Sequence, residues 1–423
     1  MNDRKDRMQD GMDEATRQTR AGRLAEATAV IQRTLRGVFH KDGPRAGQGS
    51  DTEAAEPTEP KYRIVEEKPS AKETSSESSR RGTVHGNETS TGSAKGRPAA
   101  TPGVHFPGVR RPPESMRSST ERVRPVTPGV SPSSAQTSGQ FIDKSFSNAA
   151  GTRAYKLYIP SAYTGQALPL VIMLHGCTQS SVDFAAGTRM NVLAERDTFF
   201  VAYPEQATSA NGSKCWNWFQ PANQHRGKGE PSLIAGITRE IMSGYHIDAK
   251  RVYVAGMSAG GAMATIMAAT YPDLYAAVGV HSGLAYGAAH DFRSGFEAMK
   301  KGASQHMQQL AKAIPLITFH GDRDTTVAII NEDHMLDQWL QGINDGGKPA
   351  GGATVERGHV AGGHDYTRFT YPDARGRAIV EKWIVHRAGH AWSGGSSKGS
   401  FTEPKGPDAS TEMMRFFNEH RGR

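Results

Sequence analysis

The sequence has little cysteine and no long apolar segment. Only two of its 423 residues are Cys, which is too few for a disulfide-rich scaffold. The longest apolar run, residues 168–174, is far shorter than the roughly 20 residues that a membrane-spanning helix needs. The first 30 residues also lack the apolar core of a secretory signal. These absences favour a cytoplasmic location.

Other familiar signals are missing as well. The sequence has neither the Cys/His spacing of a metal site nor a Gly-rich loop that cradles phosphate. The formal net charge of +8 is made of mixed signs and accompanies no nucleic-acid-binding motif. We therefore expect chemistry without a metal or cofactor, and no nucleic-acid partner.

Composition divides the chain into three parts. Residues 40–140 are rich in Ser, Thr, Pro, Gly, Arg and Glu and poor in large apolar side chains, which predicts a disordered linker. Residues 1–39 precede it as a short helical segment, with an apolar stripe within residues 8–36. The stripe favours docking on its own domain or on a second copy, with a docking handle for another partner as the alternative. Residues 141–423 suffice for one catalytic domain.

Regular patterning begins within that last part. Strands are predicted at 153–159 as an edge strand, and at 168–174, 199–203, 251–255, 275–281, 315–320 and 381–385. Helices are predicted at 232–245 and 261–271. Such alternation indicates an α/β fold with a mostly parallel central sheet and helices on both faces. The chemistry of such sheets lies at the carboxyl ends of the strands.

The most informative motif is the pentapeptide Gly256-Met257-Ser258-Ala259-Gly260, which lies between a strand and a helix. A serine on so sharp a turn has strained backbone angles and an exposed hydroxyl, and the flanking glycines allow the turn to close. The pattern predicts a nucleophile elbow, with Ser258 as the nucleophile. Packing alone is the alternative for any single pattern of this kind.

A serine needs a base and an acid, which follow it in this fold in the order acid, then histidine. The acid should follow a late strand, and His320-Gly321-Asp322-Arg323-Asp324 does so. We assign the role to Asp324. Asp322 is the competitor, and is the better candidate for a turn-forming residue.

The histidine should lie in the loop after the last strand. His390 meets this condition, and the small residues around it leave room for an imidazole. His386 is too close to the strand end and is expected to be structural. His359 and His364 are assigned to hairpin positions without function.

An oxyanion hole needs two backbone amides. One should come from Ala259, the residue after the nucleophile, and the other from the loop that follows residues 168–174. We place the second amide at Cys177.

Three tryptophans near these motifs need a role. Trp216 and Trp218 lie in one loop, and Trp392 lies beside the predicted base. Rings of this size either fill the core or line a cleft. We favour a cleft wall for all three.

The motifs together resemble the poly(3-hydroxybutyrate) depolymerase family of esterases, an α/β-hydrolase family. The similarity covers roughly residues 140–420 and rests on five ordered motifs: Leu174-His175-Gly176-Cys177-Thr178-Gln179, Cys215-Trp216-Asn217-Trp218, the pentapeptide around Ser258, His320-Gly321-Asp322-Arg323-Asp324 and Gly389-His390-Ala391-Trp392. The resemblance implies serine-ester hydrolysis by Ser258, Asp324 and His390. It also implies a disulfide between Cys177 and Cys215.

The resemblance leaves several functions open. Short or amorphous hydroxyalkanoate esters are the expected substrates, because no signal peptide or separate polymer-binding domain is visible. Feruloyl or acetylxylan esterase activity is the first alternative, since those families share much of the pattern. A granule-associated binding protein with an idle hydrolase domain is the second. Residues 8–36 could associate weakly with a polymer granule, and an extracellular location is the alternative to the cytoplasmic one, as for many members of that family.

Overall fold

The computed structural model describes residues 139–303, 307–343, 352–373 and 375–422, together with Gly11, Glu14, Arg17, Val30 and the backbone of residues 62–64. The predicted linker at 40–140 therefore lies almost entirely outside the described residues. The same holds for most of the helical segment at 1–39 and for the association predicted for residues 8–36. None of the helices in the described part of the chain is both long and apolar enough to cross a membrane.

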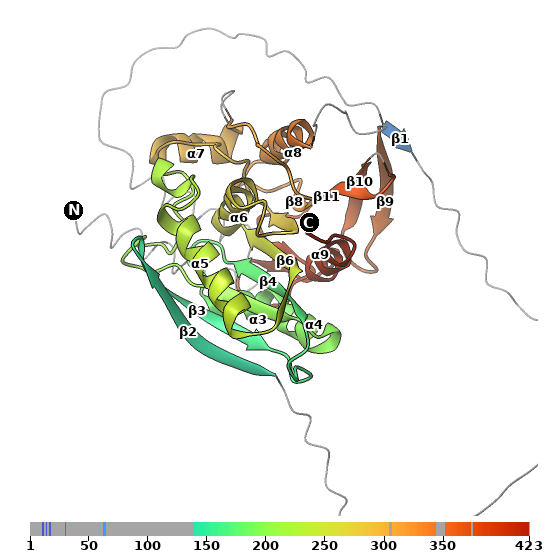
Figure 1. Ribbon diagram of the computed structural model, residues 1–423. Coiled ribbons are helices and arrows are strands. Elements are labelled where there is room, and N and C mark those ends of the chain that lie inside the picture. The colour runs from blue at the N-terminus through green and yellow to red at the C-terminus, as the bar shows by residue number, and fades with distance from the viewer. Residues whose placement is uncertain are drawn as a thin grey trace, which may run out of the picture. The chain divides into compact units, whose positions relative to one another are not determined.

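One large sheet organises the domain (Figure 1). Its strand order is β1-β9-β10-β11-β8-β7-β6-β4-β5-β3-β2. The six central strands, from β11 to β5, all pair in parallel. They are β4 (Leu168–Leu174), β5 (Phe200–Pro204), β6 (Ile247–Met257), β7 (Ala277–His281), β8 (Leu316–Gly321) and β11 (Ala378–Val385).

These strands are parallel and central because they are apolar on both faces. In β4, for example, every residue is buried. Leu170 and Ile172 pack in the core on one face of the sheet, whereas Val171 and Met173 pack in the core on the other. The predicted α/β-hydrolase architecture is confirmed.

Helices cover both faces. The first core contains residues of α5 (Gly229–Gly244), α6 (Ala259–Thr270) and α8 (Ile330–Gly342), and α7 (Phe292–Lys301) packs against α8. The second core contains residues of α3 (Ser181–Thr188), α4 (Met190–Asp197) and α9 (Ala409–Asn418). The helix predicted at 261–271 begins instead at Ala259, directly after Ser258.

The prediction that residues 153–159 form an edge strand is wrong. They belong to β3 (Gly151–Ile159), which pairs on one side with β5 and on the other with β2 (Gln140–Asn148). The β2 strand is half exposed, and it has few large apolar side chains to mark it in the sequence. One of them, Phe146, fits against Gly236 of α5, where a Cβ would lie 2.1 Å from the ring.

The opposite end of the sheet is an antiparallel hairpin of β9 (Ala353–His359) and β10 (Asp365–Pro372). His359 and His364 lie at this hairpin, as predicted. The backbone of β1 (Tyr62–Ile64) pairs in parallel with β9. A short helix η1 (Pro221–Asn223) and a two-stranded sheet of β12 (Trp392–Ser393) and β13 (Thr402–Glu403) complete the described elements.

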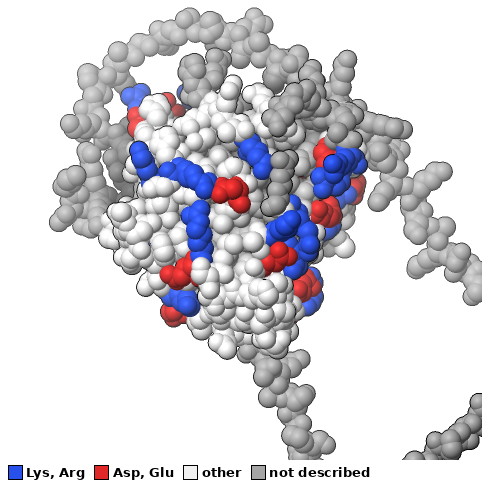
Figure 2. Space-filling model, viewed as in Figure 1, with Lys and Arg blue, Asp and Glu red and all other residues white. Residues whose placement is uncertain are grey.

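Charged side chains of both signs lie next to one another on the surface. On the face drawn in Figure 2, blue and red atoms occur together, with large uncharged areas between them. One surface ion pair, Arg226–Asp273 at 2.5 Å, joins side chains that are 50% and 59% exposed. Exposed pairs of this kind contribute little to stability.

Candidate active site

Ser258 lies on a strained turn between β6 and α6. Its backbone angles are φ 57° and ψ −122°, which a side-chain-bearing residue adopts only when the surroundings enforce it. Its own N–H donates to the His281 carbonyl oxygen at 2.9 Å. A Cβ at Gly256 would lie 2.3 Å from the Gly260 oxygen, and one at Gly260 would lie 2.1 Å from the Leu174 oxygen. The two glycines are therefore required for the tight turn that presents the hydroxyl.

Asp324 and His390 come together from two loops. Asp324 follows β8 and His390 follows β11, and the two strands are neighbours in the sheet. His390 Nδ1 is 2.7 Å from Asp324 Oδ2. Because a carboxylate oxygen accepts, Nδ1 carries the proton and Nε2 keeps its lone pair.

The Asp324 carboxylate is held in its charged form. Burial by itself would raise its pKa, but the charge and hydrogen bond of His390 and the nearby His320 outweigh burial and lower the pKa to about 2. Its other oxygen accepts hydrogen bonds from the Thr326 and Val327 backbone N–H groups, each at 2.9 Å. The carboxylate is therefore fixed on both sides.

The competing residues lie elsewhere. Asp322 accepts from the backbone N–H of Arg387 at 2.6 Å, and its other oxygen lies 2.9 Å from His386 Nδ1. The His386 side chain is 36% exposed, and Nε2 of its ring contacts the Thr367 hydroxyl. Asp322 and His386 thus form a separate surface contact, away from Asp324.

Ser258 and His390 line the same pocket. Within the described part of the chain, the Ser258 hydroxyl forms no hydrogen bond with His390 or with any other side chain. In unliganded sites such bonds are often long and shorten only when substrate binds. The arrangement therefore has the three predicted groups at one rim of the sheet, with the serine hydroxyl free to face a substrate.

The loop after β4 approaches the serine closely. A Cβ at Gly176 would lie 3.5 Å from Ser258 Cβ. The Gly176 N–H is already used, because it donates to Gln179 Oε1 at 2.9 Å. Ala259 is the first residue of α6, where backbone N–H groups have no acceptor within the helix. The amides of Cys177 and Ala259 therefore remain the candidates for an oxyanion hole.

A buried imidazole fixes this loop. His175 Nε2 accepts from the Gln206 backbone N–H at 3.0 Å, so that Nδ1 carries the proton and donates to the Gly176 oxygen at 2.7 Å. Burial lowers the pKa of His175 to about 4, which keeps the ring neutral. The loop is also tied by a disulfide between Cys177 and Cys215.

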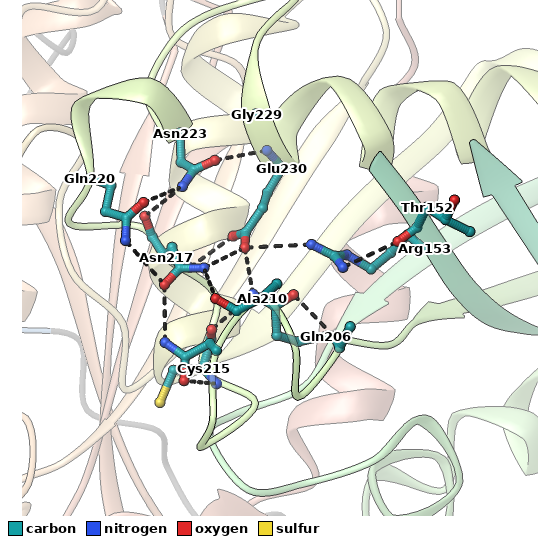
Figure 3. A network of polar contacts seen from close by, with 12 residues as sticks. Thr152, Arg153, Gln206, Ala210, Cys215, Asn217, Gln220, Asn223, Gly229 and Glu230 are labelled. Carbon is teal, nitrogen blue, oxygen red and sulfur yellow. Dashed lines mark hydrogen bonds and ion pairs between the residues drawn. The ribbon is translucent and has the colours of Figure 1, made fainter. Parts of the chain in front are cut away.

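A polar network anchors the chain on the other side of that disulfide (Figure 3). At its centre is the buried carboxylate of Glu230 at the start of α5. It accepts from the Asn217 backbone N–H at 2.8 Å, from Asn217 Nδ2 at 2.7 Å and from Gln206 Nε2. Gln206 Nε2 also donates to the Cys215 oxygen at 2.9 Å, and the Arg153 guanidinium lies 3.6 Å from the carboxylate. Glu230 thus holds Gln206, whose backbone N–H binds His175 and whose side chain binds Cys215, the disulfide partner of Cys177.

The pocket above Ser258 is walled mainly by aromatic and apolar side chains and encloses about 90 Å³. One wall is α7, which places Phe292, Gly295, Phe296 and Met299 on the pocket side. The Phe219 ring packs edge-on against Phe292, with the centroids 5.3 Å apart. No group of three His, Cys, Asp or Glu side chains in the described ranges is arranged to bind a metal.

Helix α7 was not predicted from the sequence. Its apolar residues recur at the spacing of one helix face, which was a usable signal. The sequence does not show which part of the domain this face packs against, because α7 reaches the pocket only through tertiary contacts.

Two of the three tryptophan assignments are wrong. Trp218 lines the pocket, but Trp216 and Trp392 do not. The Trp216 ring is fully buried, with His175 and the Arg153 guanidinium at 5.7 and 5.9 Å. Trp392 is equally buried, and its Nε1 donates to Ser410 Oγ at 3.1 Å. Both rings fill the core, because burying the whole ring removes more apolar surface from water than lining a cleft does.

Together the mostly parallel sheet and the strained serine turn define an α/β-hydrolase. The profile of the family described as "Esterase PHB depolymerase" matches residues 153–357. The chain is 32% identical over 289 residues to a poly(3-hydroxyalkanoate) depolymerase C of Paucimonas lemoignei. The aligned region covers 65% of this chain and 66% of that protein. It belongs to the PHB depolymerase esterase family, a family of carboxylic ester hydrolases.

Other relatives act on different esters by name. A probable acetylxylan esterase A of Neosartorya fischeri is 31% identical over 234 residues, which is 51% of this chain and 62% of that protein. The chain therefore covers less than two thirds of the length of either relative. Among solved structures, an acetyl xylan esterase from Aspergillus awamori superposes with a TM-score of 0.51 at 22% identity, over 66% of this chain and 99% of that one. That likeness shows the shared fold.

Proposed function

We propose that this chain is a serine esterase that hydrolyses short hydroxyalkanoate esters through an acyl-enzyme. One observation supports this most: Ser258 stands on a strained turn and shares a pocket with His390, whose Nδ1 is bound to Asp324. The apolar wall of the pocket suits a short aliphatic acyl group. The 32% identity to a hydroxyalkanoate depolymerase supports the same substrate class.

The reaction proceeds in two halves. Ser258 Oγ attacks the ester carbonyl carbon while His390 Nε2 takes the hydroxyl proton. The oxygen of the tetrahedral intermediate becomes negative and accepts hydrogen bonds from the Cys177 and Ala259 amides. The intermediate then collapses, the C–O bond to the alcohol breaks, and His390 returns the proton to the leaving alcohol. Water repeats the cycle on the acyl-enzyme and releases the acid.

Asp324 supports both halves without changing its own charge. Its carboxylate holds His390 with Nε2 toward the serine, and it stabilises the imidazolium that forms when the proton arrives. Since its pKa lies at about 2, it stays ionised at any pH near neutrality.

The test combines labelling and kinetics. A fluorophosphonate probe should label the wild-type protein, and Ser258→Ala should abolish both the label and the hydrolysis of a hydroxybutyrate trimer. Ser243→Ala, a change of another serine on exposed α5 surface, is the matched control and should alter neither. A wild-type protein that takes no label would contradict the proposal and favour the binding-protein alternative.

An acetyl ester of a carbohydrate is the second candidate substrate, supported by the acetylxylan esterase relative. Parallel rates on the hydroxybutyrate trimer, acetylated xylan and methyl ferulate separate the candidates. Because the pocket is lined mainly by apolar and aromatic side chains, we expect the hydroxybutyrate trimer to react fastest of the three. A preference for acetylated xylan would replace the hydroxyalkanoate assignment.

The disulfide bears on the location. Disulfides persist in oxidising compartments, so the Cys177–Cys215 bond supports the extracellular alternative over the cytoplasmic one. A mass-tagged maleimide applied to protein taken directly from its cells should add no tag before reduction and two after it. Two tags before reduction would restore the cytoplasmic expectation.

A further inference from the structure

A second imidazole lies behind the Asp324–His390 pair. The His320 side chain is 0% exposed, at the end of β8. Its Nε2 is 2.9 Å from the Val327 carbonyl oxygen and 3.5 Å from Asp324 Oδ2. A carbonyl oxygen can only accept, so Nε2 carries a proton.

The other side of the same ring faces a second carboxylate. His320 Nδ1 is 3.5 Å from Oε2 of Glu332, whose side chain is 1% exposed in α8. Neither of these two atoms has a hydrogen-bond partner among the described residues. The other Glu332 oxygen accepts from the Thr318 hydroxyl.

This geometry requires one more proton. A bare Nδ1 would direct its lone pair at a carboxylate oxygen, and two unsatisfied acceptors would face each other in the protein interior. A proton on Nδ1 turns the contact into a buried ion pair and places one positive charge between the carboxylates of Glu332 and Asp324.

Electrostatics agrees with that placement. Burial would lower the pKa of His320, but Glu332 and Asp324 outweigh burial and raise it. A third buried imidazole, His281, has the opposite environment: burial lowers its pKa to about 3, and its Nε2 accepts from the Ser393 N–H at 2.9 Å. The titratable groups next to His320 are therefore the carboxylates of Glu332 and Asp324 and the imidazole of His281, and His390 contacts Asp324.

We propose that His320 is a positioning residue, held as an imidazolium between Glu332 and Asp324, that fixes the Asp324 carboxylate in place for His390. The kinetic part of this proposal rests on the proposed esterase function. The His320 charge attracts Asp324 Oδ2, the same oxygen that binds His390 Nδ1, and so helps to hold the orientation of the His390 ring. Loss of the charge should therefore lower kcat more than it changes KM.

The first arm uses the wild-type full chain and does not depend on activity. Nitrogen-15 NMR of histidine-labelled protein at pH 8 should show a buried imidazole with both nitrogens protonated that persists in His420→Gln, the variant that removes the other buried ring with both nitrogens facing carbonyl oxygens. That signal should disappear in His320→Gln, or change to a neutral imidazole in Glu332→Gln if the first variant does not fold. A His320 ring with an unprotonated Nδ1 at pH 8 would overturn the proposal.

The second arm is kinetic. His320→Gln can still donate to the Val327 oxygen but cannot hold a charge, and we expect kcat to fall about tenfold with KM changed less than twofold. The same fall in kcat is expected in Glu332→Gln. His420→Gln is the matched control: that ring is also buried, with both nitrogens 2.7 Å from carbonyl oxygens of Phe416 and Ala378, and it lies after α9.

The outcomes are separable. A folded His320→Gln protein whose kcat matches the wild type would refute the positioning role. An equal fall in kcat in His420→Gln would also refute it, because the effect would then follow from any buried histidine. If the wild-type protein hydrolyses no ester, the proposed function fails, while the NMR arm still decides the charge of His320.

Discussion

The Glu230 network offers the sharpest test of how the pocket is held. Donors alone surround the carboxylate: Asn217 gives two hydrogen bonds, Gln206 gives one and the Arg153 guanidinium lies 3.6 Å away. A glutamine at position 230 keeps one carbonyl oxygen. Its amide group would then point at a donor and leave one buried N–H without an acceptor.

The magnitude follows from two losses. An unsatisfied buried donor costs about 1–3 kcal/mol. The Arg153 side chain is 6% exposed, so its charge would also lose its buried partner, a loss that can reach about 3–5 kcal/mol when a pair is broken outright. Since the glutamine oxygen retains part of both interactions, we expect Glu230→Gln to lower the free energy of unfolding by about 3 kcal/mol.

The measurement is urea denaturation followed by tryptophan fluorescence, with the disulfide intact. Glu297→Gln, which removes one charge of an exposed ion pair with Arg293 in α7, is the control; it should change the stability by less than about 0.5 kcal/mol. Adding Arg153→Met to Glu230→Gln removes the unpaired charge, so the double variant should lose at least about 1 kcal/mol less than the two single losses together. A Glu230→Gln protein as stable as the wild type, or strictly additive losses, would refute the reasoning.

Three further outcomes follow from the site. Gly295→Val places a Cβ 3.1 Å from Phe219 Cβ. KM for the hydroxybutyrate trimer should therefore rise about fivefold, while KM for an acetate ester stays within twofold. Equal changes in the two KM values would show that α7 does not select the acyl group. Reducing the Cys177–Cys215 bond opens a loop of 38 residues and should lower the free energy of unfolding by up to about 4 kcal/mol. Ester hydrolysis should also become slower. An unchanged rate of hydrolysis would show that the disulfide does not hold the loop in the conformation that binds the oxyanion. The pKa of Asp324 in the folded protein, about 2, lies below its ordinary value of 3.8. The ionised carboxylate therefore stabilises the fold by about 2.5 kcal/mol above pH 4, and this stabilisation is lost as the pH falls through 2. In Asp324→Asn the free energy of unfolding should depend less on pH in this acid range.

The sequence was most informative where function depends on short segments. The turn at Ser258 needs two glycines at fixed offsets, and their backbone contacts with Leu174 and with one another explain why the pattern is so specific. The order of strand ends likewise predicted which loops meet, and the structure brings Asp324 and His390 to 2.7 Å. Both inferences follow from local geometry and from the parallel connection of strands.

The sequence was least informative where packing over long separations decides. Trp216 and Trp218 are two residues apart, yet one fills the core and the other lines the pocket. The groups that surround this loop, Arg153 at the Trp216 ring and Glu230 at the Asn217 N–H, lie elsewhere in the chain. The proton on His320 is still less visible, because it depends on two carboxylates brought to opposite sides of one ring.

The loop that bears Cys177 is restrained from three directions. His175 holds its backbone through Gly176, the disulfide holds Cys177 itself, and Gln206 connects both restraints to the Glu230 carboxylate. Preorganised amides stabilise a developing oxyanion only if they need not move when the charge appears. A buried carboxylate contributes little net stability to a fold, since burial raises the pKa of Glu230 and opposes its charge. Its position fits the proposal that the Cys177 amide is held rigid to bind the oxyanion.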